Sequence, residues 1–129
     1  LGPRDIENGQ CVCVRRDNGE KTPVALSALA EGVKAQLDAV QQGLFDKAKR
    51  NLDEHTYPAY SLAEAKALQE EKGGFIKTMW CGSLDCELAM KEQAGMSSRC
   101  IPFEQEQLGD ICACCGKPAS KMIYWGVAY

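Results

Sequence analysis

The sequence lacks any apolar run long enough to span a membrane. Its uninterrupted apolar stretches are only a few residues long, whereas a transmembrane helix needs about 20 apolar residues. The first residue is Leu1, and no basic segment followed by an apolar segment lies near it, so we find no secretory signal. We therefore expect a piece of a longer cytoplasmic protein with no membrane partner.

Histidine is nearly absent, and the glycine-rich motifs that cradle phosphates are missing. The single histidine, His55, lies at the predicted end of a helix, so neither a Ser/His/Asp nor a Cys/His catalytic arrangement can be assembled. We interpret His55 as a C-terminal cap that interacts with the helix dipole. Neither G-x-x-x-x-G-K-[ST] nor G-x-G-x-x-G occurs, so nucleotide binding by such a loop has no support.

Basic side chains are also fewer than acidic ones. Fifteen Lys and Arg face 18 Asp and Glu, a net charge of −3, which argues against nucleic-acid binding through the overall field of the protein. A local basic group remains around the predicted hairpin and is a candidate for contacting a phosphate backbone; a solvated edge is the alternative interpretation. Its members are Arg4, Arg15, Arg16 and Lys21.

The 129 residues, 45% hydrophobic and 26% charged, suit one domain or two small ones. A β-hairpin is predicted near the start of the sequence, with strands over residues 10–16 and 21–25 and a turn at Asn18-Gly19. Because two strands are only marginally stable alone, we interpret residues 1–26 as the remnant of a larger sheet.

A long amphipathic helix is predicted after the hairpin, with Ser27 as its N-cap. Its two glycines, Gly32 and Gly43, each weaken it by about 1 kcal/mol relative to Ala. One face is apolar and the other charged, so we expect the helix to lie on a core with one side in water. The apolar positions, three or four residues apart, are Leu29, Val33, Leu37, Val40, Leu44, Ala48 and Leu52.

The second half alternates between predicted strands and helices. Tyr57-Pro58 ends the long helix and begins a short strand or linker. A capping box at Ser61 and Glu64 opens a helix that ends at Lys72. Further on we predict strands over 75–80, 99–103 and 121–129 and a helix over 84–94. We therefore predict an α+β chain: a hairpin remnant and long helix, then a small α/β sandwich-like layer stapled by zinc.

Eight cysteines, about 6% of the chain, are too few for a secreted disulfide scaffold, and their spacing indicates zinc. Cys81 and Cys86 form a C-x4-C pair, and Cys112 and Cys115 form a C-x2-C pair 25 residues later. Two such pairs supply four thiolates for a tetrahedral ion with bonds near 2.3 Å. Four cysteine ligands leave no open coordination position, so we predict a structural role for the metal rather than a catalytic one.

The second pair leaves an alternative open, because Cys114 could replace Cys112 or Cys115 at the cost of a worse turn. We prefer Cys112 with Cys115, whose x2 spacing places both sulfurs on one ion. Cys100, Cys11 and Cys13 are interpreted as small buried apolar residues. Outside the cysteines, three aromatic residues near the predicted metal site are interpreted as core rather than base-stacking residues: Trp80, Tyr124 and Trp125.

Several segments together resemble one family, in the right order over nearly the whole chain. They are Gly2-Pro3-Arg4-Asp5-Ile6-Glu7, Val14-Arg15-Arg16-Asp17, Gly19-Glu20-Lys21, Trp80-Cys81-Gly82, Arg99-Cys100-Ile101-Pro102-Phe103, Cys115-Gly-Lys-Pro-Ala119 and Tyr129. In this combination they resemble the C-terminal end of prolyl-tRNA synthetase, a class II enzyme, in its archaeal/eukaryote-like type.

The resemblance implies a division into residues 1–55, the end of the anticodon-binding domain with its long helix, and residues 56–129, the zinc-binding C-terminal domain. It implies the same four zinc ligands and places the carboxylate of Tyr129 toward the active site of the whole enzyme. ATP and Mg²⁺ would be bound only by the missing catalytic domain, tRNA-Pro would be the partner of the full-length enzyme, and that enzyme would be a cytoplasmic homodimer. This stretch itself should catalyse nothing.

Two alternatives come from other classes of protein. One is a free-standing zinc module that binds nucleic acid, which a basic groove beside the metal would favour. The other is a dithiol oxidoreductase that uses Cys112 and Cys115, which a reversible disulfide that leaves the fold intact would favour.

Overall fold

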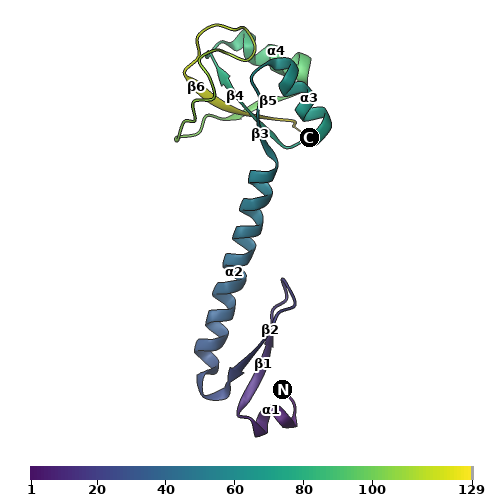
Figure 1. Ribbon diagram of the computed structural model, residues 1–129, viewed down its shortest axis with the longest axis vertical. Helices are drawn as coiled ribbons and strands as arrows, with labels where there is room; N and C mark the ends of the chain where they lie inside the picture. The colour runs from purple at the N-terminus through teal and green to yellow at the C-terminus, as the bar shows by residue number, and fades with distance from the viewer. Residues whose placement is uncertain (129) are drawn as a thin grey trace. The chain divides into compact units, whose positions relative to one another are not determined.

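The computed structural model describes residues 1–128, which form two compact units, residues 1–51 and residues 52 onward. Figure 1 shows the order of the elements along the chain. They are α1 (Pro3–Glu7), β1 (Gln10–Val14), β2 (Lys21–Ala25), a 3₁₀ turn (Leu26–Ala28), α2 (Leu29–Glu54), β3 (Thr56–Pro58), α3 (Leu62–Lys72), β4 (Phe75–Trp80), α4 (Leu84–Ala94), β5 (Ser97–Cys100) and β6 (Lys121–Gly126). The chain is thus α+β, as predicted. Among residues 1–128, no helix is long and apolar enough to cross a membrane.

The first unit holds the predicted hairpin, with β1 and β2 antiparallel and Gln10 opposite Ala25. The loop is longer than a two-residue Asn-Gly turn. Its closing bond runs from the backbone N–H of Arg15 to the carbonyl of Glu20, and inside it the backbone N–H of Gly19 donates to the carbonyl of Arg15. Gly19 has φ +75°, the left-handed conformation that a glycine adopts without strain. The segment before β1 forms the short helix α1, which we did not predict.

The long helix α2 has the predicted extent, but two expectations about it were wrong. Ser27 is not its N-cap, because it lies inside the 3₁₀ turn that leads into the helix. The helix does not lie on a core either: none of its 26 residues is buried, and Leu37 and Leu44 are at least half exposed. The reason is that the hairpin alone has too little surface to cover an apolar stripe of this length.

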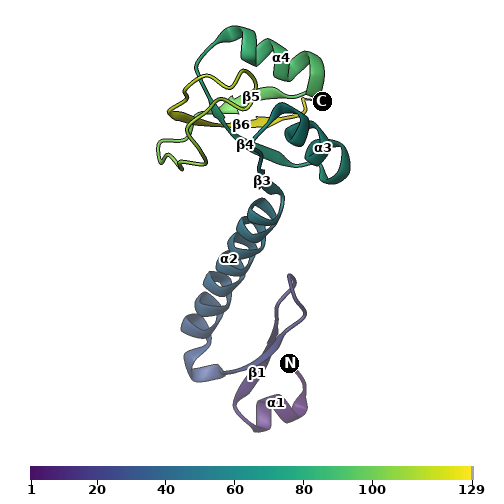
Figure 2. The ribbon, with the colours of Figure 1, turned by 45° about the horizontal axis from the view of Figure 1, so that its top comes forward.

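The second unit is a four-stranded mixed sheet in the order β3-β4-β6-β5, shown with α3 and α4 in Figure 2. The strand β3 is parallel to β4, and β6 is antiparallel to both β4 and β5. Both helices contact each other and the sheet. The core between them holds mainly apolar side chains: Ala59, Ala65, Ile76, Met90, Met96, Ile123 and Trp125.

Local signals in the sequence set the ends of these elements. The Glu64 N–H donates to Ser61 Oγ (3.1 Å), which confirms the predicted cap of α3, and Gly73 and Gly95 end α3 and α4 with positive φ. The predicted strand at 99–103 lies earlier, at Ser97–Cys100, because Pro102 cannot donate to a strand ladder. The last strand ends at Gly126, and the predicted role of Tyr129 falls on a residue outside those described.

Candidate metal centre

Four cysteine side chains come from three places around the sheet. Cys81 follows the last residue of β4, and Cys86 lies in the first turn of α4. Between them, Gly82 has φ +87°, and the indole N–H of Trp80 donates to the carbonyl of Ser83 (3.2 Å). The turn that carries the first pair is therefore tied to both the strand and the helix.

The second pair lies on a tight turn just before β6. The Cys112 N–H donates to the carbonyl of Lys117 (2.8 Å), and the Gly116 N–H donates back to the carbonyl of Cys112 (2.9 Å). Gly116 has φ +69°, which closes this turn without strain. The Ala113 N–H donates to the carbonyl of Met79 in β4 (3.1 Å), which attaches the turn to the strand that ends next to Cys81.

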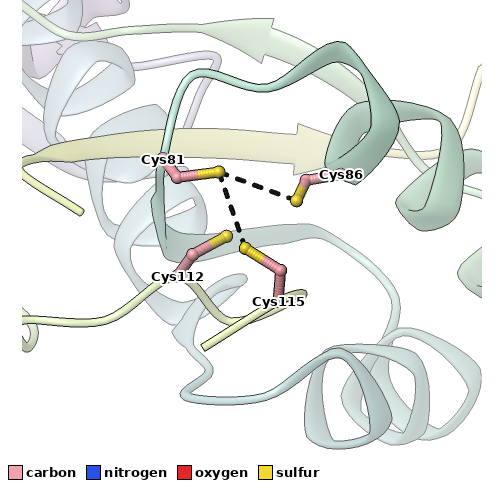
Figure 3. Close-up of side chains that lie close together, drawn as sticks. All are labelled: Cys81, Cys86, Cys112 and Cys115. Carbon is pink, nitrogen blue, oxygen red and sulfur yellow. Dashed lines mark hydrogen bonds between the residues drawn. The ribbon is translucent and has the colours of Figure 1, made fainter. Parts of the chain in front are cut away.

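The four sulfur atoms point toward one another, as Figure 3 shows. Cys81 Sγ lies 3.6 Å from Cys86 Sγ and 3.7 Å from Cys115 Sγ, and all four lie within 4.8 Å of one another. Bonds near 2.3 Å in a tetrahedron place sulfurs about 3.8 Å apart. Because all eight cysteines are free thiols, the set is available for a metal, and its geometry fits one.

The surroundings of the sulfurs favour the thiolate form at Cys112 and disfavour it at Cys86. Burial raises the pKa of the Cys112 thiol, but the backbone N–H groups of Cys115 and Cys114 favour its thiolate and bring the pKa down to about 7. For Cys86, burial raises the pKa well above its usual range, and the neighbouring sulfurs of Cys115 and Cys81 act in the same direction. A cation among these sulfurs would favour their thiolate forms.

Cys114 lies apart from the four-sulfur cluster. Its Sγ donates to the carbonyl of Cys86 at 3.5 Å, and the side chain packs against the core. Burial, together with the sulfurs of Cys112 and Cys115, raises the pKa of Cys114 to about 11. Of the arrangements that the spacing left open, this geometry matches the one that uses Cys112 and Cys115.

The other three cysteines correct our expectation of burial. Cys100 is exposed, while Cys11 and Cys13 are only half-buried. Cys100 is exposed because it ends β5 at the edge of the sheet. Cys11 and Cys13 belong to a hairpin that has almost no core around it, since among residues 1–51 only Val24 is buried.

The predicted basic group lies entirely in the first unit and is not uniform. Arg15 is engaged within its own loop: its guanidinium pairs with Asp17 (2.7 Å) and Glu20 (3.5 Å) and donates to the carbonyl of Ala39 (3.1 Å). The side chains of Arg4, Arg16 and Lys21 are exposed. The group thus offers three exposed cations, Arg4 on α1 and Arg16 and Lys21 on the hairpin, and Arg15 serves mainly to hold the loop.

The three aromatic residues that we interpreted as core residues differ in how deeply they are buried. Trp125 is fully buried and donates to Thr78 Oγ1 (2.9 Å), and Trp80 packs against the core. Tyr124 is half-buried on the other face of the sheet, in a cavity that the sequence did not predict.

His55 directly follows α2, and its backbone N–H donates to the carbonyl of Leu52.

We compared the sequence of the chain with known protein families and proteins. The family described as "Prolyl-tRNA synthetase, C-terminal" matches residues 62–129. Over all 129 residues, the chain is 52% identical to "Proline--tRNA ligase 2" of a strain of Bacillus cereus and 50% identical to "Proline--tRNA ligase" of Clostridium novyi. Its identity to "Proline--tRNA ligase" of Lachnospira eligens is 48%.

In each of these alignments, the whole chain matches only 27% of the relative. The chain therefore spans about a quarter of the length of these relatives, and the other three quarters have no counterpart in it.

Proposed function

Because the chain belongs to the family of prolyl-tRNA synthetase C-terminal domains, we propose that it is the C-terminal portion of a proline–tRNA ligase. The observation that carries the proposal is the identity of about one half over the full 129 residues, without interruption by an unmatched domain. The parent enzyme joins proline to tRNA-Pro with ATP and Mg²⁺, which the remaining three quarters bind. This portion supports the enzyme and does no chemistry.

Residues 1–55 complete the anticodon-binding domain on the tRNA side. In support, β1 and β2 form a sheet of only two strands, and exposed apolar side chains such as Val14, Leu37 and Leu44 need a cover. The rest of that domain supplies the cover, and Arg4, Arg16 and Lys21 add positive charge beside it, with Arg15 holding the loop.

Residues 56–129 form the zinc-binding C-terminal domain, and zinc is bound by Cys81, Cys86, Cys112 and Cys115. Zinc supplies four bonds that join the end of β4, the start of α4 and the turn before β6, and four thiolates leave it no open position for chemistry. A dithiol oxidoreductase needs only two sulfurs, so the convergence of four favours the metal. A free-standing nucleic-acid module is disfavoured by the acidic residues around this unit.

In the full-length enzyme, a cytoplasmic homodimer, the carboxylate of Tyr129 points toward the active site. The resemblance to the family supports this placement.

The test is a chimera of the Bacillus cereus ligase in which this chain replaces the matching 27%. We expect the chimera to charge tRNA-Pro at a rate within about tenfold of the parent ligase, while the ligase without that quarter is inactive. Elemental mass spectrometry of the 129-residue chain should find about one zinc, with four thiols protected until chelation. An inactive but folded chimera would contradict the proposed function, and absence of metal would contradict the zinc assignment separately.

A further inference from the structure

The two faces of the four-stranded sheet are covered unequally. Side chains alternate between faces along a strand, and Ile76, Ile123 and Trp125 point into the core beneath α3 and α4. Lys77 and Tyr124, which are paired across β4 and β6, therefore lie on the second face. The helices α3 and α4 pack on the first face, and of α2 only Leu52 and Asp53 line the cavity on the second face.

A loop covers only one end of this second face. Gln105 accepts from the Met122 N–H (2.6 Å) and donates to the Met122 carbonyl, and Glu106 pairs with Lys77. Met79 and Met122 are buried there. Beyond Lys77 the face is open and holds a cavity of about 520 Å³, large enough for several side chains. Its lining residues all lie in the second unit: Leu52, Asp53, Thr56, Phe75, Lys77, Arg99, Cys100 and Tyr124.

A glycine keeps the open end of the face flat. A Cβ at Gly126 would lie 3.2 Å from Arg99 Nε and 3.3 Å from Phe75 Cδ1, so the guanidinium and the ring both rest over the backbone of Gly126. Arg99 also donates from Nη2 to the carbonyl of Gly126 (3.1 Å). An arginine and an aromatic ring are thereby held side by side at the surface, and both residue types are enriched at protein interfaces.

We propose that this open face, defined by Phe75, Arg99, Cys100 and Tyr124, is a docking surface for a polypeptide segment from the other three quarters of the ligase. The inference rests on the proposed function, since it takes the occupant from the part of the relatives that this chain lacks. The segment carries an apolar side chain for the space between Phe75 and Tyr124 and a carboxylate or carbonyl for Arg99.

The charges around the cavity favour polypeptide over RNA. Asp53 lines the cavity, and Glu106 neutralises Lys77 at its edge, so a phosphate would meet two carboxylates near the single remaining cation of the lining, Arg99. RNA binding through stacked bases also depends on a positively charged groove. A polypeptide surface accommodates this mixture of aromatic, acidic and basic groups.

The exposed thiol of Cys100 makes the docking measurable. We expect iodoacetamide to alkylate Cys100 at least tenfold more slowly in the Bacillus cereus chimera than in the 129-residue chain, without tRNA, as followed by peptide mass spectrometry. In the chimera, Arg99→Glu should restore most of the reactivity of Cys100, while Lys91→Glu on the exposed surface of α4 should leave it protected. The comparison between the chimera and the isolated chain uses no substitution, so it remains a valid test even if the Arg99→Glu variant misfolds.

Each other outcome contradicts the proposal in a recognisable way. Equal reactivity of Cys100 in the chimera and in the isolated chain means that the face stays open. Protection that appears only when tRNA is added identifies RNA as the occupant, and protection that rises with the concentration of the isolated chain identifies a second copy. Because charging of tRNA is measured separately, an active chimera with a reactive Cys100 overturns this inference and leaves the proposed function intact.

Discussion

At the scale of single residues, the two glycines of α2 have different reasons to be there. A Cβ at Gly32 would lie 2.3 Å from Cγ1 of Val24, the one buried side chain among residues 1–51. A Cβ at Gly43 would lie 3.0 Å from Nη2 of Arg15, the far end of a long side chain. Gly32 therefore lets the hairpin approach the helix, whereas Gly43 leaves room for a group that can shift.

This difference predicts opposite effects of the same substitution. Gly32→Ala should destabilise the first unit by up to about 2 kcal/mol, because overpacking costs about 1–3 kcal/mol and the gain in helix propensity offsets only about 1 kcal/mol of this cost. Gly43→Ala should be neutral or stabilising by up to about 1 kcal/mol. Urea unfolding, monitored by the circular dichroism signal of helix, measures the free energy of unfolding of both variants. Equal changes at the two positions would refute the close approach of Val24.

Cys86 is the buried member of the first pair, and we predict that Cys86→Ser abolishes zinc binding at micromolar zinc. Apparent zinc binding contributes about 10–16 kcal/mol in small structural sites, and a serine hydroxyl is a poor substitute for a thiolate. Elemental mass spectrometry gives the stoichiometry. Cys100→Ser is the matched control, because Cys100 is exposed and outside the cluster; a Cys86→Ser chain that still holds one zinc would contradict the ligand assignment.

At the scale of elements, the hairpin loop contains an ion pair between Arg15 and Asp17 (2.7 Å). The hydrogen bond from Arg15 lowers the pKa of Asp17 below its usual value, and the same bond raises the pKa of Arg15. Since the folded pKa of Asp17 is depressed, its contribution to loop stability is present above the unfolded pKa near 3.9 and is lost as the pH falls through the folded pKa.

We therefore predict that an NMR titration places the pKa of the Asp17 carboxyl below about 3.9 in this chain and that Arg15→Met raises it toward that value. Arg16→Met, at the exposed neighbouring position, should leave it unchanged. A titration of Asp17 that is the same with and without Arg15 would show that the pair does not order the loop.

Local patterns in the sequence predicted most element ends and the cysteine cluster, and failed where contacts between elements decide. The Ser61 cap and the glycines after α3 and α4 act within a few residues, so sequence is enough to find them. Burial is not local: we expected the apolar stripe of α2 and Cys100 in β5 to be buried, yet within the described residues no residue of α2 is buried and Cys100 is exposed. The cavity around Arg99 could not be predicted from local patterns, because its lining comes from the end of α2 and several strands.

At the scale of the whole molecule, the two compact units should respond differently to loss of metal. All four candidate ligands lie in the second unit, where they connect β4, α4 and the turn before β6. The first unit has no cysteine in the cluster, and its stability depends on contacts of Val24 and Arg15 with α2. Zinc binding and folding are coupled only where the ligands are brought together by the fold.

We predict that chelation removes amide-exchange protection from β4, α4 and β6 but leaves it in β1, β2 and the first half of α2. Hydrogen exchange with mass spectrometry, with and without a zinc chelator, measures this segment by segment. Lower pH should release zinc by the same route, because protons compete for thiolates, and Cys86→Ser should reproduce the pattern without a chelator. Uniform loss of protection in both units would mean that they unfold as one, and no loss anywhere would mean that the sulfur cluster does not hold the second unit together.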